Sequence, residues 1–195
     1  MKNVLLINGS MPYLFSKGEL NASLQEVAFK TLSKNGFNVE QTTINQGYDE
    51  ATEVEKFLKA DIIIYQIPCF YMNAPWVFWE YLAKVYTAGK GKLWENDGRS
   101  RSDPSKKYGS GGLSQGKKYM ISWTFNAPKV AFFEEGQFFS DVGVDGLSVS
   151  LHKANQSAGM SALKTFACYD VHKGDDTQKY LKEYENHILN EIVNS

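Results

Sequence analysis

The sequence is poor in cysteine and histidine and carries almost no net charge, and each shortage excludes a class of protein. Only two cysteines, Cys69 and Cys168, occur in 195 residues, and their spacing fits neither a disulfide framework nor a zinc motif. The three histidines, His152, His172 and His187, are scattered and share no metal-ligand spacing. A formal net charge of −1 predicts no nucleic-acid-binding surface.

The sequence also has no long hydrophobic run. The apolar run from Val4 to Ile7 ends at Asn8-Gly9 and is too short for a signal segment or a membrane span. With the unpaired cysteines, this predicts a cytoplasmic protein that is not inserted in a membrane. The length favours one domain over residues 1–195.

Aromatic side chains, by contrast, are plentiful at 14% of the residues. The stretch from Tyr65 to Leu82 is rich in rings, and Phe70 and Tyr71 fall in a predicted loop between Pro68 and Pro75. Exposed loop aromatics cost solubility unless something covers them. We therefore expect this loop to form the wall of a pocket for a flat, π-rich ligand.

Strands and helices alternate along the chain. Five apolar runs predict strands, with amphipathic helical segments predicted between them at 20–36, 49–60, 74–91, 144–159 and 177–193. The predicted strands are Asn3–Asn8, Asn38–Ile44, Asp61–Ile67, Lys118–Thr124 and Lys164–Val171. This alternation predicts an α/β fold, namely a flavodoxin-like doubly wound sheet of five parallel strands in the order 2-1-3-4-5 with helices on both faces.

Ligands of such sheets bind beyond the carboxyl ends of the strands. After the first strand, the chain lacks the G-x-G-x-x-G fingerprint of dinucleotide-binding folds. It places Ser16, Lys17, Gly18, Asn21 and Ser23 at a helix N-terminus, where free N–H groups favour a phosphate. From the local sequence alone, simple helix capping by Ser16 is the more common role.

The segment after the fourth strand holds Thr124, Phe125, Asn126 and Ala127. Asn126 is suited either to hydrogen-bond a heterocycle or to order the turn before Pro128. No nucleophile–histidine–acid arrangement and no general base is evident. Cys69 is either a redox-active thiol or, more commonly, a structural one.

Several motifs together resemble one known family. They include "NVLLINGS", "SKGELNASL", "HKANQ" and, most specifically, the block from Asp97 to Lys118. The chain resembles the modulator of drug activity B family over nearly its whole length. These proteins are flavodoxin-like NAD(P)H:quinone reductases related to the DT-diaphorases, known as FAD-containing homodimers with flavins near the subunit interface.

The resemblance implies roles for individual residues. The segment from Ser16 to Ser23 would hold the FAD diphosphate, and Tyr71 and Tyr108 would contact flavin or substrate, Tyr108 as a hydrogen-bond partner or proton source. The implied cofactor-binding residues are Ser16, Lys17, Gly18, Leu20, Asn21, Ser23, Pro68, Cys69, Phe70, Tyr71, Tyr108, Thr124, Phe125, Asn126 and Ala127.

The chain departs from the family in the same loops. Family members typically read Pro-Gly-Trp-Trp-Met-Gly where this chain has Pro68 to Asn73. Cys69 and Asn73 thus replace glycines, and Asn tolerates a positive φ better than Cys does. Phe15 stands where a polar His is common. These changes bear on how well the chain binds flavin.

The implied reaction is two-electron hydride transfer from NAD(P)H through flavin N5 to a quinone by a ping-pong mechanism, with FAD expected rather than FMN. Main-chain N–H groups of the loops 68–71 and 124–127 would stabilise the reduced flavin. Two alternatives stay open, which are a flavin-binding electron carrier or sensor and a divergent member with weakened flavin binding.

Overall fold

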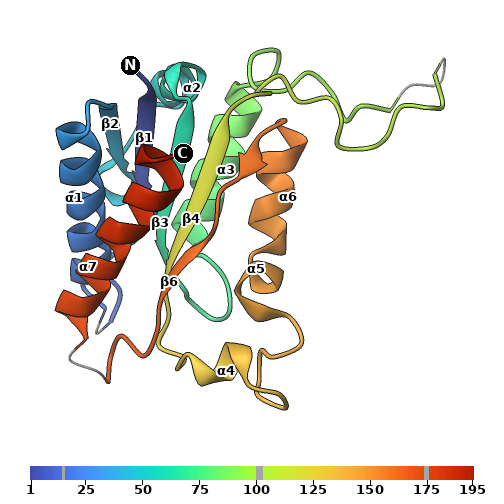
Figure 1. The fold of residues 1–195 in the computed structure, drawn as a ribbon. Coiled ribbons are helices and arrows are strands. Elements are labelled where there is room, and N and C mark those ends of the chain that lie inside the picture. Colours follow the sequence, from blue (N-terminus) through green and yellow to red (C-terminus); the bar gives the residue numbers. More distant parts are fainter. Residues whose placement is uncertain (15, 100–102, 174–175) are drawn as a thin grey trace.

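A computed structural model describes residues 1–14, 16–99, 103–173 and 176–195. Phe15, one of the departures from the family, therefore lies outside the described residues. The centre of the structure is a parallel sheet in the order β2-β1-β3-β4-β5, and β6 also pairs with β4 (Figure 1). The strands are β1 (Asn3–Asn8), β2 (Asn38–Thr43), β3 (Ile62–Pro68), β4 (Lys118–Thr124), β5 (Ser161–Ala162) and β6 (Phe166–Cys168). The predicted fold and strand order are confirmed.

Helices cover both faces of the sheet, so the central strands are apolar on both sides. On one face, α1 (Glu19–Lys34) and α7 (Thr177–Ile188) pack on alternate residues of β1, β3 and β4. On the other face lie α2 (Glu50–Lys59), α3 (Trp76–Ala88) and α6 (Val149–Ser157) (Figure 1). The shorter helices are η1 (Ile44–Gln46), α4 (Val130–Phe133), α5 (Gly143–Leu147) and the π-helical turn η2 (Leu189–Val193).

Helix ends follow local sequence signals. The Asp49 side chain caps α2 by accepting a hydrogen bond of 2.8 Å from Thr52 N–H, as expected for an N-cap residue. Gly36 follows α1 with a φ of +82°, the left-handed conformation that ends many helices. Within the described part of the chain, no helix is both long and apolar enough to span a lipid bilayer.

The fifth predicted strand is wrong in its extent. Only β6 falls within the predicted range of 164–171, and β5 precedes it, because the residues between the two short strands leave the ladder. There, Lys164 N–H donates to a carboxylate oxygen of Glu191, and the Thr165 hydroxyl donates to Asp145. The strand also ends earlier than predicted, since Asp170 has a φ of +54°, which an extended strand does not allow.

The predicted helix at 144–159 is also divided. The Ser148 hydroxyl donates to Val144 C=O at 2.8 Å and accepts from Trp123 Nε1–H at 2.8 Å. Such a side chain competes with the helical main chain for its own carbonyl groups. The chain therefore bends at Ser148 and separates α5 from α6.

Candidate functional site

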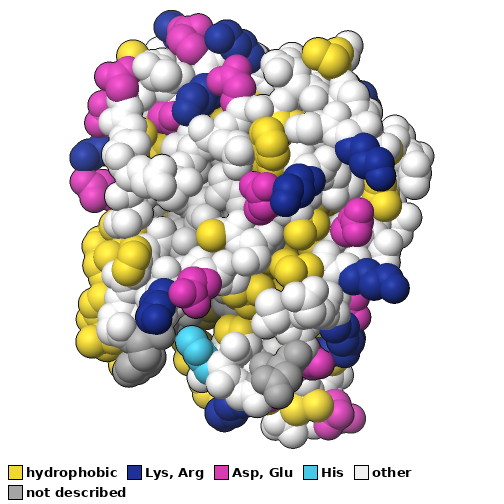
Figure 2. All heavy atoms as spheres, turned by 90° about the vertical axis from the view of Figure 1, so that its left-hand side faces the viewer, with side chains coloured by type: hydrophobic (Ala, Val, Ile, Leu, Met, Phe, Trp, Pro, Cys, Tyr) yellow, Lys and Arg dark blue, Asp and Glu magenta, His cyan; other side chains and the backbone are white. Residues whose placement is uncertain are grey.

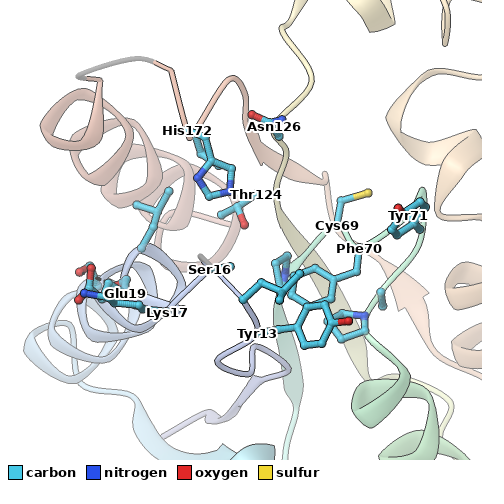
Figure 3. Close-up of a pocket in the computed structure, with 18 of the residues that line it drawn as sticks. Tyr13, Ser16, Lys17, Glu19, Cys69, Phe70, Tyr71, Thr124, Asn126 and His172 are labelled. Atoms are coloured by element: carbon cyan, nitrogen blue, oxygen red, sulfur yellow. Dashed lines mark hydrogen bonds between the residues drawn. The ribbon is translucent and has the colours of Figure 1, made fainter.

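A cavity of about 920 Å³ lies at the carboxyl end of the sheet, where the segments after β1, β3, β4 and β6 meet. The first three of these segments are the ones in which the sequence predicted a site. The predicted residues that line the cavity are Ser16, Lys17, Gly18, Leu20, Ser23, Pro68, Cys69, Phe70, Tyr71, Thr124 and Asn126. Figure 3 shows Tyr13 and Phe70 on one side of the cavity and Thr124 and His172 on the other.

The polar end of the cavity is the start of α1. Its first α-helical hydrogen bond joins Ala22 N–H to Gly18 C=O, so the N–H groups of residues 19–21 precede the hydrogen-bonded part of the helix. Gly18 has a φ of +78°, and a Cβ there would lie 3.0 Å from Ser10 Oγ. Lys17 and Glu19 lie side by side at this helix start (Figure 3) and offset each other in charge, so the N–H groups and the positive end of the helix dipole are what suit a phosphate.

The opposite end is aromatic. The Tyr13 ring lies 6.0 Å from the Phe70 ring and packs edge to face on Trp76, with 5.4 Å between centroids. Trp76 is 54% exposed although it belongs to α3, most of whose other aromatic side chains pack in the core. These three rings offer a flat ligand apolar surface.

A tight turn places Tyr71 at the mouth of the cavity. The main chains of Phe70 and Asn73 exchange two hydrogen bonds of 2.7 and 3.1 Å, and the two residues between them, Tyr71 and Met72, have φ values of 45° and 64°. Two successive positive φ values define a type I′ turn, which normally takes Asn and Gly. The Tyr71 side chain lies at the tip of this turn and is fully exposed.

The two lost glycines carry no conformational penalty. The positive φ values of this loop belong to Tyr71 and Met72, not to Cys69 or Asn73. The Asn73 side chain instead accepts hydrogen bonds from Ala74 N–H and Trp79 Nε1–H. Substitution of glycine by Cys69 and Asn73 is therefore compatible with this backbone.

Cys69 lines the cavity as a protonated thiol. Burial raises its pKa to about 11, although nearby main-chain N–H groups of Met72 and Asn73 act to lower it. Reactive cysteines have a depressed pKa instead. The structural role for Cys69 fits this environment better than the redox role.

Three predicted residues lie behind the cavity wall rather than on it. Asn21 is 4% exposed and hydrogen-bonds to Thr124 and Gln66, because its position on α1 faces the sheet. Phe125 is 1% exposed and packs among core rings. Ala127 accepts a main-chain hydrogen bond from Asp170. These residues support the site, and their side chains do not line it.

Tyr108 does not reach the cavity of its own chain. It lies on the long segment between α3 and β4, which extends from the body of the protein (Figure 1). This segment enters β4 at the amino end of the strand, whereas the cavity lies at the carboxyl ends. The Tyr108 ring is 76% exposed, and the Arg99 guanidinium lies 5.5 Å from its centre.

The structure adds residues that the sequence reasoning missed. His172 and Thr177 line the cavity from the segment after β6, while Tyr13 and Trp76 line its aromatic end. The N–H of Val171 donates to Phe125 C=O at 3.1 Å and thereby anchors this segment beside β4. His172 follows the last strand by four residues. The rule that ligands bind beyond the carboxyl ends of the strands would therefore also have pointed to it.

Two further features bear on metal and nucleic-acid ligands. Within the described ranges, no three His, Cys, Asp or Glu side chains gather as they would around a metal ion. Figure 2 shows the face covered by α1 and α7, on which basic and acidic side chains are interspersed rather than separated by sign. This pattern does not form the basic patch typical of nucleic-acid binding.

Comparison with known proteins gives a consistent set of relatives. Residues 2–192 match a family profile described as a flavodoxin-like fold. The chain is 45% identical over 186 residues to NADPH:quinone oxidoreductase MdaB of Haemophilus influenzae, covering 95% of this chain and 97% of that protein. It is 46% identical over 192 residues to an uncharacterized protein of Schizosaccharomyces pombe, covering 98% and 97% of the two chains.

Solved structures share the fold at lower identity. A putative quinone reductase from Klebsiella pneumoniae matches with a TM-score of 0.76 and 18% identity, covering 96% of this chain and 84% of that one. General stress protein 14 of Treponema denticola, solved in complex with FMN, matches with a TM-score of 0.66 and 13% identity, covering 96% of each chain. At these identities the likeness shows the fold alone.

Proposed function

The chain belongs to the flavodoxin-like modulator of drug activity B family, and on that premise we propose that it is a flavin-dependent NAD(P)H:quinone oxidoreductase. The observation that carries this proposal is the cavity that joins a phosphate-suited helix start to three aromatic rings. A flavin nucleotide has the same two parts, a phosphate and a flat ring system. The 45% identity to an NADPH:quinone oxidoreductase supports the activity.

The residues present fit a flavin. A Cβ at Gly18 would lie 3.0 Å from Ser10 Oγ at a φ of +78°, so glycine suits this position, and close backbone approach is what a phosphate cradle requires. The family resemblance favours FAD, and the cavity volume of about 920 Å³ lies near the upper end of the usual range for ligand sites. His172 and Thr177 extend the lining beyond the start of α1, where the second half of a dinucleotide would lie.

The chemistry that a bound flavin supplies is two-electron hydride transfer from NAD(P)H to a quinone in ping-pong order. The protein binds and orients the ring. Tyr13, Phe70 and Trp76 would provide its apolar contact surface. Tyr71, exposed at the cavity mouth, is placed to contact whichever substrate enters.

Main-chain donors in these loops are fewer than the sequence indicated. Pro68 has no N–H, and the N–H groups of Cys69, Phe70 and Phe125 already donate to main-chain carbonyls. Within the described part of the chain, the N–H groups of Tyr71, Asn126 and Ala127 have no protein acceptor. These three donors are suited to stabilise negative charge on a reduced ring.

We further propose a homodimer located in the cytoplasm. Exposed Tyr71, Met72 and Trp76 surround the cavity mouth with apolar surface of the kind that a second subunit covers. A role for Tyr108 in catalysis then requires that it reach the cavity of the partner subunit. Two free, widely separated cysteines support a reducing compartment.

The experiment that tests this function starts from purified full-length protein. We expect a yellow protein that releases FAD on denaturation and that oxidises NADPH or NADH rapidly only when a quinone is added. Release of FMN instead of FAD would change the identity of the proposed cofactor and leave the proposed activity in place. Reduction by NAD(P)H that fails in stopped flow, despite bound flavin, would support the electron-carrier alternative. A colourless protein that does not take up added flavin would reject the proposal.

A further inference from the structure

Beneath the cavity floor, two buried amide side chains form a chain of hydrogen bonds that ends on Thr124. Gln66 Nε2–H donates to Asn21 Oδ1 at 2.9 Å, and Asn21 Nδ2–H donates to Thr124 Oγ1 at 3.1 Å. The three side chains come from β3, α1 and β4, and none is more than 4% exposed. Neither amide lines the cavity, whereas Thr124 does.

The contacts at the inner end of this chain favour one direction, in which Gln66 Oε1 is left with no partner among the described residues. Gln66 Nε2 also lies 3.4 Å from the main-chain carbonyl oxygen of Ser122, and a carbonyl oxygen can only accept. A reversed Gln66 amide would turn its own oxygen towards that carbonyl. Gln66 therefore donates to Asn21, so the atom of Asn21 that faces Gln66 is its oxygen, and the atom that faces Thr124 is its nitrogen.

This direction determines what the Thr124 hydroxyl can do. Because Oγ1 already accepts from Asn21, its own proton is available to another group. Within the described residues, no acceptor for that proton is found. Thr124 lies between Ser16 and Asn126 at the cavity wall (Figure 3), so a ligand in the cavity can supply the missing acceptor.

We propose that Gln66 and Asn21 are positioning residues that commit Thr124 to donate a hydrogen bond to an acceptor atom of the cavity's ligand. The inference rests on the proposed function for the identity of the ligand, a flavin nucleotide. Its phosphate oxygens and its ring carbonyl oxygens share the required chemistry, since both accept and neither donates. Asn21 then acts on the ligand through Thr124 and not by direct contact.

Flavin affinity of variants tests this role. Thr124→Val should weaken FAD binding by about tenfold, and Thr124→Ser should leave it near the wild-type value. Asn21→Asp should weaken binding to a similar extent as Thr124→Val, because a carboxylate only accepts and would draw the Thr124 proton away from the ligand. Gln25→Glu is the matched control, since Gln25 is a buried amide on the same helix that donates to Gln41 and does not line the cavity.

The double variant separates this mechanism from general damage. If Asn21 acts through the Thr124 proton, the Asn21→Asp change should cost no further affinity in a Thr124→Val background. Additive losses, or an Asn21→Asp protein that binds flavin as tightly as wild type does, would overturn the proposal. Comparing FAD with riboflavin distinguishes the acceptors, because an effect of Thr124→Val that vanishes with riboflavin identifies a phosphate oxygen and one that persists identifies the ring.

A measurement on the wild-type chain without ligand tests the direction itself. In NMR spectra, the Asn21 Nδ2 protons should show stronger nuclear Overhauser contacts to the Thr124 side chain than to the Gln66 side chain. Asn21 amide protons with stronger contacts to Gln66 than to Thr124 would overturn the inference. This result does not depend on the folding of any variant. It also stands if the protein binds no flavin, so failure of the proposed function and failure of the inference remain distinguishable.

Discussion

The main-chain N–H of Cys69 donates to the carbonyl oxygen of Thr124 at 2.9 Å. This hydrogen bond lies just beyond the last paired residues of β3 and β4, Pro68 and Thr124, and so joins the two loops where they leave the sheet. The loop that carries Phe70 and the loop that carries Asn126 are therefore held at a fixed separation. The bond gives two sides of the cavity a common main-chain anchor, which suits a site of the largely preformed kind that cofactors occupy.

Gly18→Ala should weaken flavin binding by about tenfold. The change places a Cβ 3.0 Å from Ser10 Oγ at a φ of +78°, at the point where the phosphate is expected to approach the backbone. Unfolding free energy should fall by about 1 kcal/mol because alanine is strained in this conformation. Fluorescence titration with FAD and urea denaturation measure the two effects.

Gly36→Ala is the control for this strain. Gly36 has a φ of +82°, a Cβ added there would meet no atom within 4 Å, and the residue lies at the opposite end of α1. We expect a similar loss of stability with unchanged flavin affinity. If the Gly18 and Gly36 variants bind FAD with equal affinity, the phosphate does not bind at the start of α1.

Phe70→Ala should raise the dissociation constant for FAD by about tenfold, since ring stacking contributes on the order of 1 kcal/mol beyond area burial. Phe70 is half-buried and touches Tyr13, so its loss opens the aromatic end of the cavity. Phe138→Ala removes a phenyl ring that is 75% exposed and outside the cavity. If both variants bind FAD equally, Phe70 is not part of the ring site.

The two residues of the type I′ turn, Tyr71 and Met72, should respond differently to substitution, one in activity and the other in stability. Met72→Gly should raise the free energy of unfolding by about 0.5–1 kcal/mol, because glycine adopts a φ of 64° without strain. Tyr71→Ala should leave stability nearly unchanged, since its ring is fully exposed, and should lower the rate of quinone reduction. Denaturation curves and steady-state kinetics of the two variants test this, and an unaltered rate in Tyr71→Ala would remove Tyr71 from the site.

Stability should decline at alkaline pH partly because of Cys69. Burial raises its pKa from 9.0 to about 11, so the folded protein retains a proton that the unfolded chain releases. The thiol therefore does not change the free energy of unfolding below pH 9. As the pH rises from about 9 to about 11, it lowers that free energy progressively. Urea denaturation of Cys69→Ala should show a shallower decline in that window, and a parallel decline would mean that this thiol titrates normally.

The sequence was sufficient for the sheet but not for the details of its edge. The strands Asn3–Asn8 and Lys118–Thr124 agree with the structure residue for residue, because strands buried on both faces are continuously apolar. The fifth strand was misjudged, since the Lys164 main-chain N–H bonds to Glu191 and the Thr165 hydroxyl bonds to Asp145, which interrupts it. Such contacts join residues far apart in the chain, and no local pattern encodes them.

The candidate site, too, depends on contacts between distant residues that a local sequence pattern does not encode. Loop position alone selected Ser16, Phe70 and Asn126, which line the cavity. It also selected Asn21, whose direction depends on how α1 rotates against the sheet, so that the side chain turns inward to Thr124. His172 was missed because the last strand was not treated as a source of ligand-binding residues.

A crystal structure of the protein with bound FAD tests the central claim most directly. We expect the diphosphate to contact the start of α1 around Gly18 and the isoalloxazine ring to lie against Phe70 and Tyr13. If FAD binds elsewhere, or if the chain's own side chains fill this cavity, the proposal that these loops form a flavin site is wrong.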